Sequence, residues 1–239
     1  MTILALERVS KSYGALKVTD DISLNVARGE TLGIIGPNGA GKTTLFNLIS
    51  GHVRVDGGRV VFADQEITAL LPHARCRRGI GRSYQIPHPF VGMTVFENLL
   101  VAATFGGGLS ESEAEPHCVD VLERAGLQGK ANYLAGSLTL LDRKRLELAR
   151  ALATRPKLLL LDEIAGGLTE HEAKALVALI HEIKATGMSL LWIEHVMHAL
   201  AAVADRMLVI HFGTKLAEGE PDAVLANPEV KRVYMGIEV

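Results

Sequence analysis

The sequence predicts an α/β fold, and three observations lead to that prediction. Apolar residues make up 48% of the chain and aromatic residues only 5%, so the core is aliphatic, as in sheets covered by helices on both faces. Short apolar runs, such as 31–35 and 189–193, are separated by segments with helical spacing. At 239 residues, one unit with an inserted subdomain fits better than two equal domains.

Charge and cysteine content narrow the possible functions. The chain has 25 basic and 27 acidic residues and a net charge of −2, which gives no electrostatic case for nucleic-acid binding. Cys76 and Cys118 lack Cys-x-x-Cys spacing, so we interpret them as inert thiols in a reducing compartment. No apolar run approaches the ~20 residues that span a bilayer, and the apolar start at 1–6 is too short for a signal sequence. We therefore expect a cytosolic protein that reaches a membrane only through a partner.

The first elements are two strands with an aromatic residue between them. Residues 3–9 and 22–27 alternate apolar and polar side chains, which is typical of half-buried strands. Tyr13 lies in the polar region between these strands, where a tyrosine can simply pack against its own loop. It can also offer a face for a nucleobase, a contact worth ~1 to 3 kcal/mol. We favour base stacking because of the motifs that follow.

The central feature is a glycine loop between a predicted strand at 31–35 and a predicted helix at 43–50. The loop follows the pattern G-x-x-x-x-G-K-T, with the residues Gly36, Pro37, Asn38, Gly39, Ala40, Gly41, Lys42, Thr43 and Thr44. Its glycines allow the chain to bend around a phosphate with backbone N–H groups pointing inward. The helix that follows presents unpaired amides and the positive end of its dipole.

The side chains of this loop have specific expected roles. Lys42 would reach the β- and γ-phosphates, the Thr43 hydroxyl would bind Mg²⁺, and Thr44 would contact the α-phosphate. The alternative is a glycine-rich turn that fits the pattern by chance, but the flanking strand and helix argue against it. The sequence therefore predicts that the chain binds a nucleoside triphosphate.

The segment after the first helix is polar and rich in arginine. A turn at Gly57-Gly58 leads into a strand at 59–62, and four arginines then crowd together, at Arg75, Arg77, Arg78 and Arg82. We interpret them as a solvated basic face, the usual explanation for such a run. Gln85 precedes a loop, 86–93, in which two prolines prevent regular structure. Its apolar residues either pack against the core or form a docking surface.

The following block, residues 93–153, is helical throughout and interrupts the alternation of strands and helices. Helices are predicted at 94–104, at 110–128 and at 142–153, and the last of them starts at a capping-box-like Thr139. Its N-terminus is a possible anion site, although most capped helices bind nothing there. We assign 93–153 as an inserted subdomain and residues 1–92 and 154–239 as the core.

Two buried strands end in polar residues. The apolar strand 158–161 is followed by Asp162 and Glu163, and reacting groups gather at the carboxyl ends of parallel strands. Asp162 can bind Mg²⁺ directly or through water, and Glu163 can polarise the attacking water. The alternative is a carboxylate that merely caps the next turn. The strand 189–193 leads to His195, a structural histidine or, as its position favours, a functional one.

The remaining elements complete the alternation. A capping box at Thr169 opens a helix that continues through Thr186. The tail has one more core strand at 207–210, a turn at Gly213, and amphipathic helical stretches interrupted by Pro228.

Taken in order, these residues resemble ATP-binding cassette ATPases. The set comprises Tyr13, the loop 36–44, Gln85, the helix start at 138–143, the run 158–163 and His195. The resemblance covers nearly the whole chain. It implies a P-loop NTPase fold with a mixed core sheet, an N-terminal antiparallel β subdomain and an inserted helical subdomain.

The resemblance also implies roles for the site residues. Tyr13 stacks on adenine, Gln85 senses Mg²⁺ and the membrane partner, and Glu163 is the general base. His195 resembles the switch histidine that contacts the γ-phosphate, alongside the catalytic Lys42. The loop that crosses the dimer interface matches Gly166, Gly167, Leu168 and Thr169. ATP and Mg²⁺ are the implied ligands, and Thr43, Gln85 and Asp162 the implied metal-binding residues.

Within this family, the chain resembles the ATP-binding subunits of branched-chain amino acid importers, the LivG-like family. The segments that carry the resemblance are 79–85, 93–98 and 217–221. It implies two transmembrane permease subunits, a solute-binding protein reached indirectly, and a peripheral location at the cytoplasmic face of the inner membrane. The loop 86–93 and the helical insert would receive a permease helix. Relatives also carry urea, amides or aromatic acids, so the solute stays open.

One motif departs from the family pattern. The signature L-S-G-G-Q is replaced by Leu138, Thr139, Leu140, Leu141 and Asp142. Thr139 can replace the serine hydroxyl, but Asp142 beside a γ-phosphate would repel it by about 1 kcal/mol even in a high dielectric. We therefore hypothesise an asymmetric heterodimer with a second cassette, in which this chain supplies one working site. A homodimer stays open.

Three other functions compete with transport. A soluble cassette ATPase that acts as a mechanical clamp on DNA or ribosomes usually joins two cassettes or carries long arms, and this chain has neither. A structural subunit that binds nucleotide but barely hydrolyses it would fit the altered signature, but Glu163 and His195 argue against it. A GTPase would need an Asn-Lys-x-Asp motif, which the sequence lacks.

Overall fold

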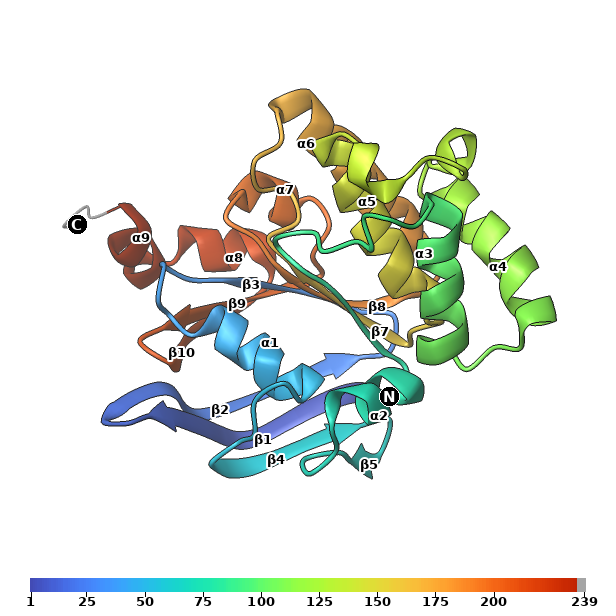
Figure 1. Cartoon of the computed structure of the whole chain (residues 1–239). Coiled ribbons are helices and arrows are strands. Elements are labelled where there is room, and N and C mark those ends of the chain that lie inside the picture. Colours follow the sequence, from blue (N-terminus) through green and yellow to red (C-terminus); the bar gives the residue numbers. More distant parts are fainter. Residues whose placement is uncertain (236–239) are drawn as a thin grey trace. The chain divides into compact units, whose positions relative to one another are not determined.

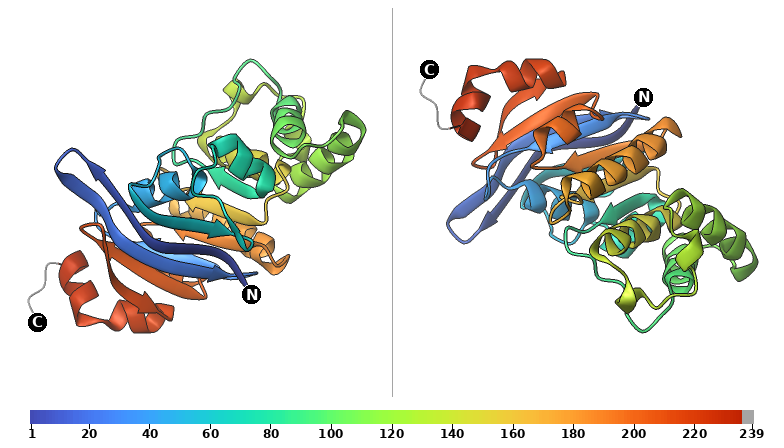
Figure 2. Two further views of the ribbon diagram at one scale, coloured as in Figure 1. Left: turned by 90° about the horizontal axis from the view of Figure 1, so that it is seen from below. Right: turned by 90° about the horizontal axis from the view of Figure 1, so that it is seen from above.

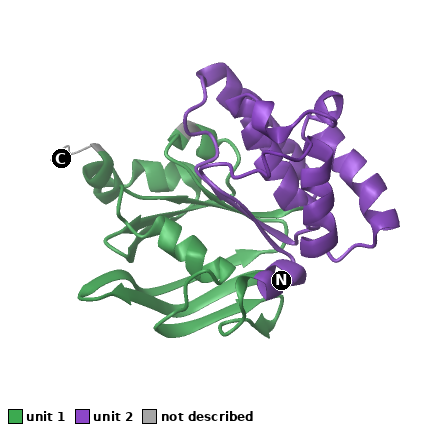
Figure 3. Ribbon diagram, in the orientation of Figure 1, with its two compact units in different colours: residues 1–72, 187–239 green, residues 73–186 purple. Residues whose placement is uncertain are grey.

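The computed structural model of the chain describes residues 1–235 (Figure 1). The chain forms two compact units: Met1–Pro72 together with Gly187–Val239, and His73–Thr186 (Figure 3). We call them unit 1 and unit 2. The predicted helical insert, residues 93–153, lies inside unit 2. Strands and helices occur in both units, as expected for an α/β fold.

Unit 1 contains an antiparallel sheet with the strand order β2-β1-β4-β5. Its strands are β1 (Thr2–Tyr13), β2 (Leu16–Ala27), β4 (Gly57–Phe62) and β5 (Gln65–Glu66). Figure 2 shows β1 and β2 as a long hairpin, so the predicted strands 3–9 and 22–27 are only parts of longer ones. The pairing of β1 with β2 shifts register at several points, and Arg8 and Asp21 nearby have φ of 52° and 53°. Bulges of this kind interrupt the period-2 pattern by which a strand is recognised in a sequence. Tyr13 is the last residue of β1 rather than part of the turn.

A second, mixed sheet positions the glycine loop. In unit 1 it has the order β10-β9-β3-β8, from β3 (Thr31–Ile35), β8 (Ser189–Ile193), β9 (Arg206–His211) and β10 (Thr214–Gly219). β3 pairs in parallel with β8 and β9, and β10 is antiparallel to β9. The continuous apolar runs of β3 and β8 are fully buried, as predicted. β10 was expected to be helical; that prediction is wrong, because its partly buried polar sequence gives no strand signal.

The helices of unit 1 are short. They are α1 (Lys42–Ser50), α7 (Met197–Ala201), α8 (Pro221–Ala226) and α9 (Pro228–Met235). α1 matches the predicted helix 43–50, and Gly51 ends it with φ of 83°. Pro221 and Pro228 start α8 and α9, at positions where a missing N–H costs nothing.

Unit 2 contains a parallel strand pair and several helices. The strands are β6 (Ile80–Ser83) and β7 (Leu158–Asp162). The helices are α2 (Pro72–Arg78), α3 (Val95–Val101), the π-helix η1 (Ala102–Gly106), α4 (Glu111–Arg124), the 3₁₀ turns η2 (Gln128–Lys130) and η3 (Ala135–Ser137), α5 (Leu140–Ala153) and α6 (Glu170–Ala185). Apolar residues from α3, η1, α4 and α5 pack into one core, which also buries Cys118. The predicted capping box at Thr169 forms, and a second one, at Thr94, opens α3.

The arginine-rich run is not the solvated face that we predicted. Residues 72–78 form α2, and Arg75 is only 2% exposed. Its burial lowers the pKa of the guanidinium to about 10. The Arg82 side chain is also buried, and only Arg77 and Arg78 are exposed. A run of like charges in a sequence therefore does not show which of its side chains are buried and which are exposed.

Within residues 1–235, no helix combines the length and the apolar character that crossing a lipid bilayer requires.

Candidate functional site

The glycine loop of unit 1 has a geometry that only glycine permits at two positions. Gly36 follows β3, and a Cβ atom there would lie 2.3 Å from the carbonyl oxygen of Ile210. Gly41 has φ of 102°, and its Cβ would lie 2.4 Å from the carbonyl oxygen of Val18. The loop is thus packed against two neighbouring backbones, while its tip at Gly39 has nothing within 4 Å of a Cβ position. Such an arrangement leaves one side of the loop open to a ligand.

The loop carries a buried cation at the start of α1. Lys42 is 5% exposed, and its ammonium group donates hydrogen bonds to the carbonyl oxygens of Gly36, at 2.7 Å, and Pro37, at 3.0 Å. The first turn of α1 has no acidic residue and no side-chain cap, and Thr43 there is exposed. The helix dipole and the ammonium group therefore both favour an anion. These residues fit a triphosphate, with the Thr43 hydroxyl available to a metal ion.

A turn far along the chain braces the loop. The Gly213 N–H donates to the carbonyl oxygen of Ala40 at 3.1 Å, and the Gly213 carbonyl accepts from the Asp20 N–H at 2.7 Å. The turn between β9 and β10 thus connects the glycine loop to β2. Sequence analysis treated Gly213 only as a turn residue, and no local signal shows this second role.

Unit 1 also contains the two other nucleotide-site residues predicted for it. Tyr13 is 49% exposed at the end of β1, with the Lys11 ammonium 5.6 Å from its ring centroid. His195 follows β8 and is exposed, and its backbone N–H donates to the Glu194 carboxylate at 3.0 Å. His195 lies just after a strand, where the sequence placed it, whereas Tyr13 ends β1 and does not lie in the turn. Their contacts with a nucleotide stay predictions.

In unit 2, the first carboxylate after β7 forms a buried ion pair. Arg82 donates from Nη2 to Oδ2 of Asp162 at 2.8 Å, and the two side chains are 6% and 4% exposed. The guanidinium also lies over the Tyr84 ring, 4.8 Å from its centroid, and burial raises the pKa of that phenol. The attraction between the two charges and their hydrogen bond offset part of the cost of burying them. Arg82 therefore fixes the carboxylate that we predicted as a magnesium ligand, a role that sequence analysis missed.

The second carboxylate contacts the predicted sensor residue. Gln85 donates from Nε2 to Oε2 of Glu163 at 2.6 Å. Glu163 has φ of 46°, a left-handed conformation that costs about 1–3 kcal/mol for a residue with a Cβ. Strain of this kind often marks a functional position. The structure thus brings together the two residues that were assigned as sensor and general base.

At the start of α5, Asp142 has partners that the sequence did not reveal. Asp142 is 4% exposed and forms an ion pair with Lys130, and its Oδ2 also accepts from the Thr139 hydroxyl at 2.8 Å. The charge that we predicted to repel a phosphate is therefore compensated within unit 2, and the Thr139 hydroxyl is occupied. Lys130 lies in η2 and carried no sequence signal. Leu140, in place of a signature glycine, is 46% exposed.

The predicted dimer-interface loop precedes α6. Gly166 and Gly167 are exposed, and Gly167 has φ of 78°. Thr169 caps α6: its N–H donates to the Glu172 carboxylate at 2.9 Å, and its hydroxyl accepts from the Glu172 N–H at 3.3 Å. The end of the loop is thus fixed by the cap at Thr169, whereas the turn at Gly166 and Gly167 is exposed.

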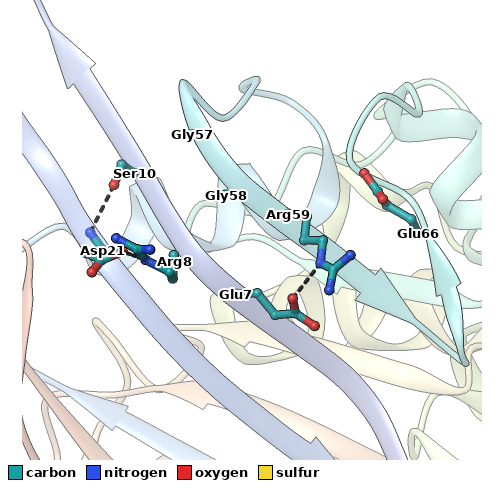
Figure 4. A pocket seen from close by; sticks show the side chains of 8 residues that line it. All are labelled: Glu7, Arg8, Ser10, Asp21, Gly57, Gly58, Arg59 and Glu66. Atoms are coloured by element: carbon teal, nitrogen blue, oxygen red, sulfur yellow. Dashed lines mark hydrogen bonds and ion pairs between the residues drawn. The ribbon is translucent and has the colours of Figure 1, made fainter.

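A polar pocket of about 670 Å³ lies on the antiparallel sheet of unit 1 (Figure 4). Its charged side chains pair with each other: Arg59 with Glu7 at 2.5 Å, and Arg8 with Asp21 at 3.0 Å. None of the residues predicted for the nucleotide site lines it. We assign it no role in the chemistry.

The described residues contain no group of three or more His, Cys, Asp or Glu side chains that could hold a metal ion. The metal-binding roles of Thr43, Gln85 and Asp162 stay predictions.

Comparisons with known proteins cover the whole chain. The family model described as "ABC transporter" matches residues 19–166, and one described as "Branched-chain amino acid ATP-binding cassette transporter" matches residues 214–239. The high-affinity branched-chain amino acid transport ATP-binding protein LivG of Escherichia coli K12 is 37% identical over 249 residues, covering 98% of each chain. The lipopolysaccharide export system ATP-binding protein LptB of the same organism is 34% identical over 236 residues, covering 99% of this chain and 98% of LptB.

A solved structure shows the same fold. The ADP conformation of MJ1267, an ATP-binding cassette of an ABC transporter, superposes with a TM-score of 0.91 and 34% identity, covering 99% of this chain and all of that one. Three findings indicate the same family: the mixed α/β architecture, the glycine loop and similarity over nearly the whole chain. The chain belongs to the ABC transporter family, as an ATPase subunit of the kind that couples ATP hydrolysis to transport.

Proposed function

We propose that this chain binds ATP with Mg²⁺ and hydrolyses it to drive uptake of branched-chain amino acids or related small polar solutes. The glycine loop with its buried Lys42 carries the nucleotide part of the proposal. The match of residues 214–239 to the branched-chain amino acid family model supports the solute class. The similar identity to an export ATPase, LptB, favours a second candidate, export of a lipid. The two candidates share the chemistry and differ in the permease partner.

In the proposed hydrolysis, each of the predicted site residues has a role. Tyr13 stacks on the adenine ring, and Lys42 with the loop amides holds the β- and γ-phosphates. Gln85 and Glu163 orient a water molecule, which attacks the γ-phosphorus in line while Glu163 accepts its proton. The bond from the γ-phosphorus to the bridging oxygen breaks, and ADP keeps that oxygen. His195 contacts the γ-phosphate.

Magnesium would be held by Thr43, Gln85 and Asp162. When bound with the nucleotide it neutralises charge on the phosphate oxygens. Arg82 keeps the Asp162 carboxylate in one orientation from its buried position.

Unit 2 offers an apolar surface for the permease subunits. Ile86 and Val91 are 65% and 62% exposed, and Leu134 is 53% exposed. Backbone hydrogen bonds join the two segments: the Ala135 N–H donates to the Met93 carbonyl and the Gly136 N–H to the Val91 carbonyl. Exposed apolar side chains held together in this way are typical of a protein-binding surface. Docking here would place the chain at the cytoplasmic face of the membrane as a peripheral subunit, with a solute-binding protein reached only through the permeases.

The second ATPase subunit is proposed to be a different cassette. Because Lys130 compensates Asp142, charge repulsion no longer favours a heterodimer. Leu140 and Leu141 do favour it, since their side chains stand where the family signature has glycines that let a backbone approach a phosphate. Light scattering on the Glu163→Gln variant with ATP and Mg²⁺ tests the pairing. A stable dimer of this chain alone would favour a homodimer, whereas a monomer that still binds ATP supports the heterodimer.

Solute uptake tests the function as a whole. Cells that lack the chain are complemented with the wild type or with Lys42→Ala, and uptake of labelled leucine is measured. The proposal is supported if the wild type restores uptake and Lys42→Ala does not. If leucine uptake is unaffected by loss of the chain while outer-membrane lipid is retained inside the cell, the export candidate replaces it.

A further inference from the structure

Lys144 is a buried cation that the proposed mechanism does not use. It lies on α5 and is 4% exposed, although lysine is rarely buried without partners. Its ammonium group donates to the backbone carbonyl oxygen of Gln85 at 2.7 Å. A charged donor of this kind makes a stronger hydrogen bond than a neutral one.

Gln85 is therefore held at two points, both within unit 2. Lys144 binds its main chain, and its own side-chain amide binds Glu163 at 2.6 Å. Gln85 is itself exposed and precedes a loop with two prolines, so it has no strand or helix to fix it. The Lys144 contact supplies the constraint that regular structure would otherwise provide.

The loop after Gln85 has two further anchors of the same type. Arg150, also on α5, donates to the His88 carbonyl at 2.8 Å, and its guanidinium lies 5.0 Å from the centre of the Phe90 ring. Asn98 on α3 accepts from the Phe90 N–H at 2.9 Å and donates to the Phe90 carbonyl at 3.1 Å. Side chains from α5 and α3 thus fix the backbone of 85–90 at three positions, whereas Ile86 faces solvent.

We propose that Lys144 is a positioning residue: it sets Gln85 against Glu163 and so ties α5, the helix that carries the altered signature, to the attack on ATP. The proposal rests on the proposed function, because Glu163 is taken as the general base. Without the ammonium group, Gln85 would rotate about its exposed backbone, and Glu163 would lose its amide partner for part of the time. Lys144 touches no reacting atom, and its effect passes through Gln85.

Steady-state kinetics test the catalytic part of the proposal. The complex is isolated from membranes through a tag on this chain, and its ATPase activity is measured. We expect Lys144→Met to lower kcat about tenfold with little change in KM for ATP, since it removes an interaction that matters in the transition state. Lys144→Arg keeps a charged donor and should retain most of the activity. Should Lys144→Met fail to fold, Lys144→Gln replaces it.

A double-mutant cycle separates positioning from a general structural effect. Gln85→Ala should lower kcat by a similar factor. Lys144→Met should add no further loss in the Gln85→Ala background, because Lys144 acts only through the Gln85 side chain, which is then absent. Lys174→Met is the matched control, since that lysine pairs with Glu170 on the exposed face of α6 with its side chain 72% exposed. It should leave both parameters unchanged. Additive losses from Lys144→Met and Gln85→Ala, or an unchanged kcat in Lys144→Met, would overturn the proposal.

Hydrogen exchange tests the anchor without nucleotide. In the isolated chain, Lys144→Met should speed amide exchange in peptides that cover 85–93 and leave peptides from α4 as in the wild type. Unchanged exchange in 85–93 would show that Lys144 does not hold the loop. A wild-type complex without ATP turnover would instead overturn the proposed function, and the exchange result would still decide whether Lys144 fixes Gln85.

Discussion

The starts of α1 and α5 are both helix N-termini that the sequence links to phosphate. They differ in whether a side chain caps them. α1 begins after Gly41 without a side-chain cap and without an acidic residue in its first turn. α5 is capped by Thr139, and Asp142 fills its first turn with a carboxylate that Lys130 balances. Free helix amides attract anions, whereas capped ones are already satisfied. We therefore expect the uncapped start of α1 to be the better anion site of the two.

The largest effect is expected from replacing the cation at the start of α1. Lys42→Met should lower ATP affinity about 10- to 100-fold, because a buried charged donor to phosphate is lost. Titration calorimetry with ATP and Mg²⁺ measures it. Lys130→Met, which removes the cation near α5, is the matched variant and should leave ATP binding to the isolated chain unchanged. Equal losses in both variants would show that the two helix starts are equivalent.

The glycines of the loop before α1 are tested next, through the stability of the fold. Gly41→Ala should lower the free energy of unfolding by about 1–3 kcal/mol from the strained φ alone, with an added clash against the Val18 carbonyl. Gly39→Ala is the control: its φ of 80° is also left-handed, but nothing lies within 4 Å of the new methyl group. Urea titrations of both variants should therefore rank Gly41→Ala as the less stable. The reverse ranking would contradict the close approach to β2.

At α5 the corresponding change acts on stability rather than on binding. Lys130→Met leaves the buried Asp142 carboxylate without its cation and should cost about 1 kcal/mol, a modest loss because the Lys130 side chain is 41% exposed. Asp142→Asn added to Lys130→Met should recover most of the loss in thermal or urea unfolding. Breaking the exposed Arg124–Asp120 pair of α4 by Arg124→Met should have little effect. No recovery in the double variant would show that the pair is not a unit.

The smallest effect is expected at a capped helix that has no link to phosphate. Hydrogen bonds from the Thr169 backbone and hydroxyl lower the pKa of Glu172, so the folded state favours its ionised form. The stability that this carboxylate adds is present above its unfolded pKa, near 4.5, and is lost as the pH falls through the lower folded value. Glu172→Gln should therefore be less stable than the wild type at pH 6, and the difference should shrink towards pH 3 in urea unfolding. A difference that is constant with pH would exclude the charge as its cause.

The elements that the sequence predicts best are those with a local signal. β3 and β8 are continuous apolar runs, and α6 opens on a capping box, and all three are confirmed. β10 and α2 were missed because their sequences are polar and short, and their stability comes from neighbours in the fold. Arg75 shows the same limit, since burial depends on the fold and not on the composition of the run.

For the candidate site, sequence patterns identify residues but not their contacts. The order of motifs led to Gln85 and Glu163, and the structure places their side chains 2.6 Å apart. The partners that support the site were not predictable: Arg82 and Asp162 are 80 positions apart, and Lys130 and Asp142 are 12 apart in different elements. No periodicity connects such pairs. The catalytic and nucleotide-binding roles of the site residues stay predictions that the variants above test.

The turn between β9 and β10 has a consequence for engineering the chain. Phe212 at its tip is 79% exposed, and exposed hairpin tips are the usual places for an inserted tag or for new chain ends. Here the next residue, Gly213, is bonded to Ala40 and to Asp20. A fluorescent label or a circular permutation opened at this turn would therefore disturb the glycine loop some 170 residues away in sequence.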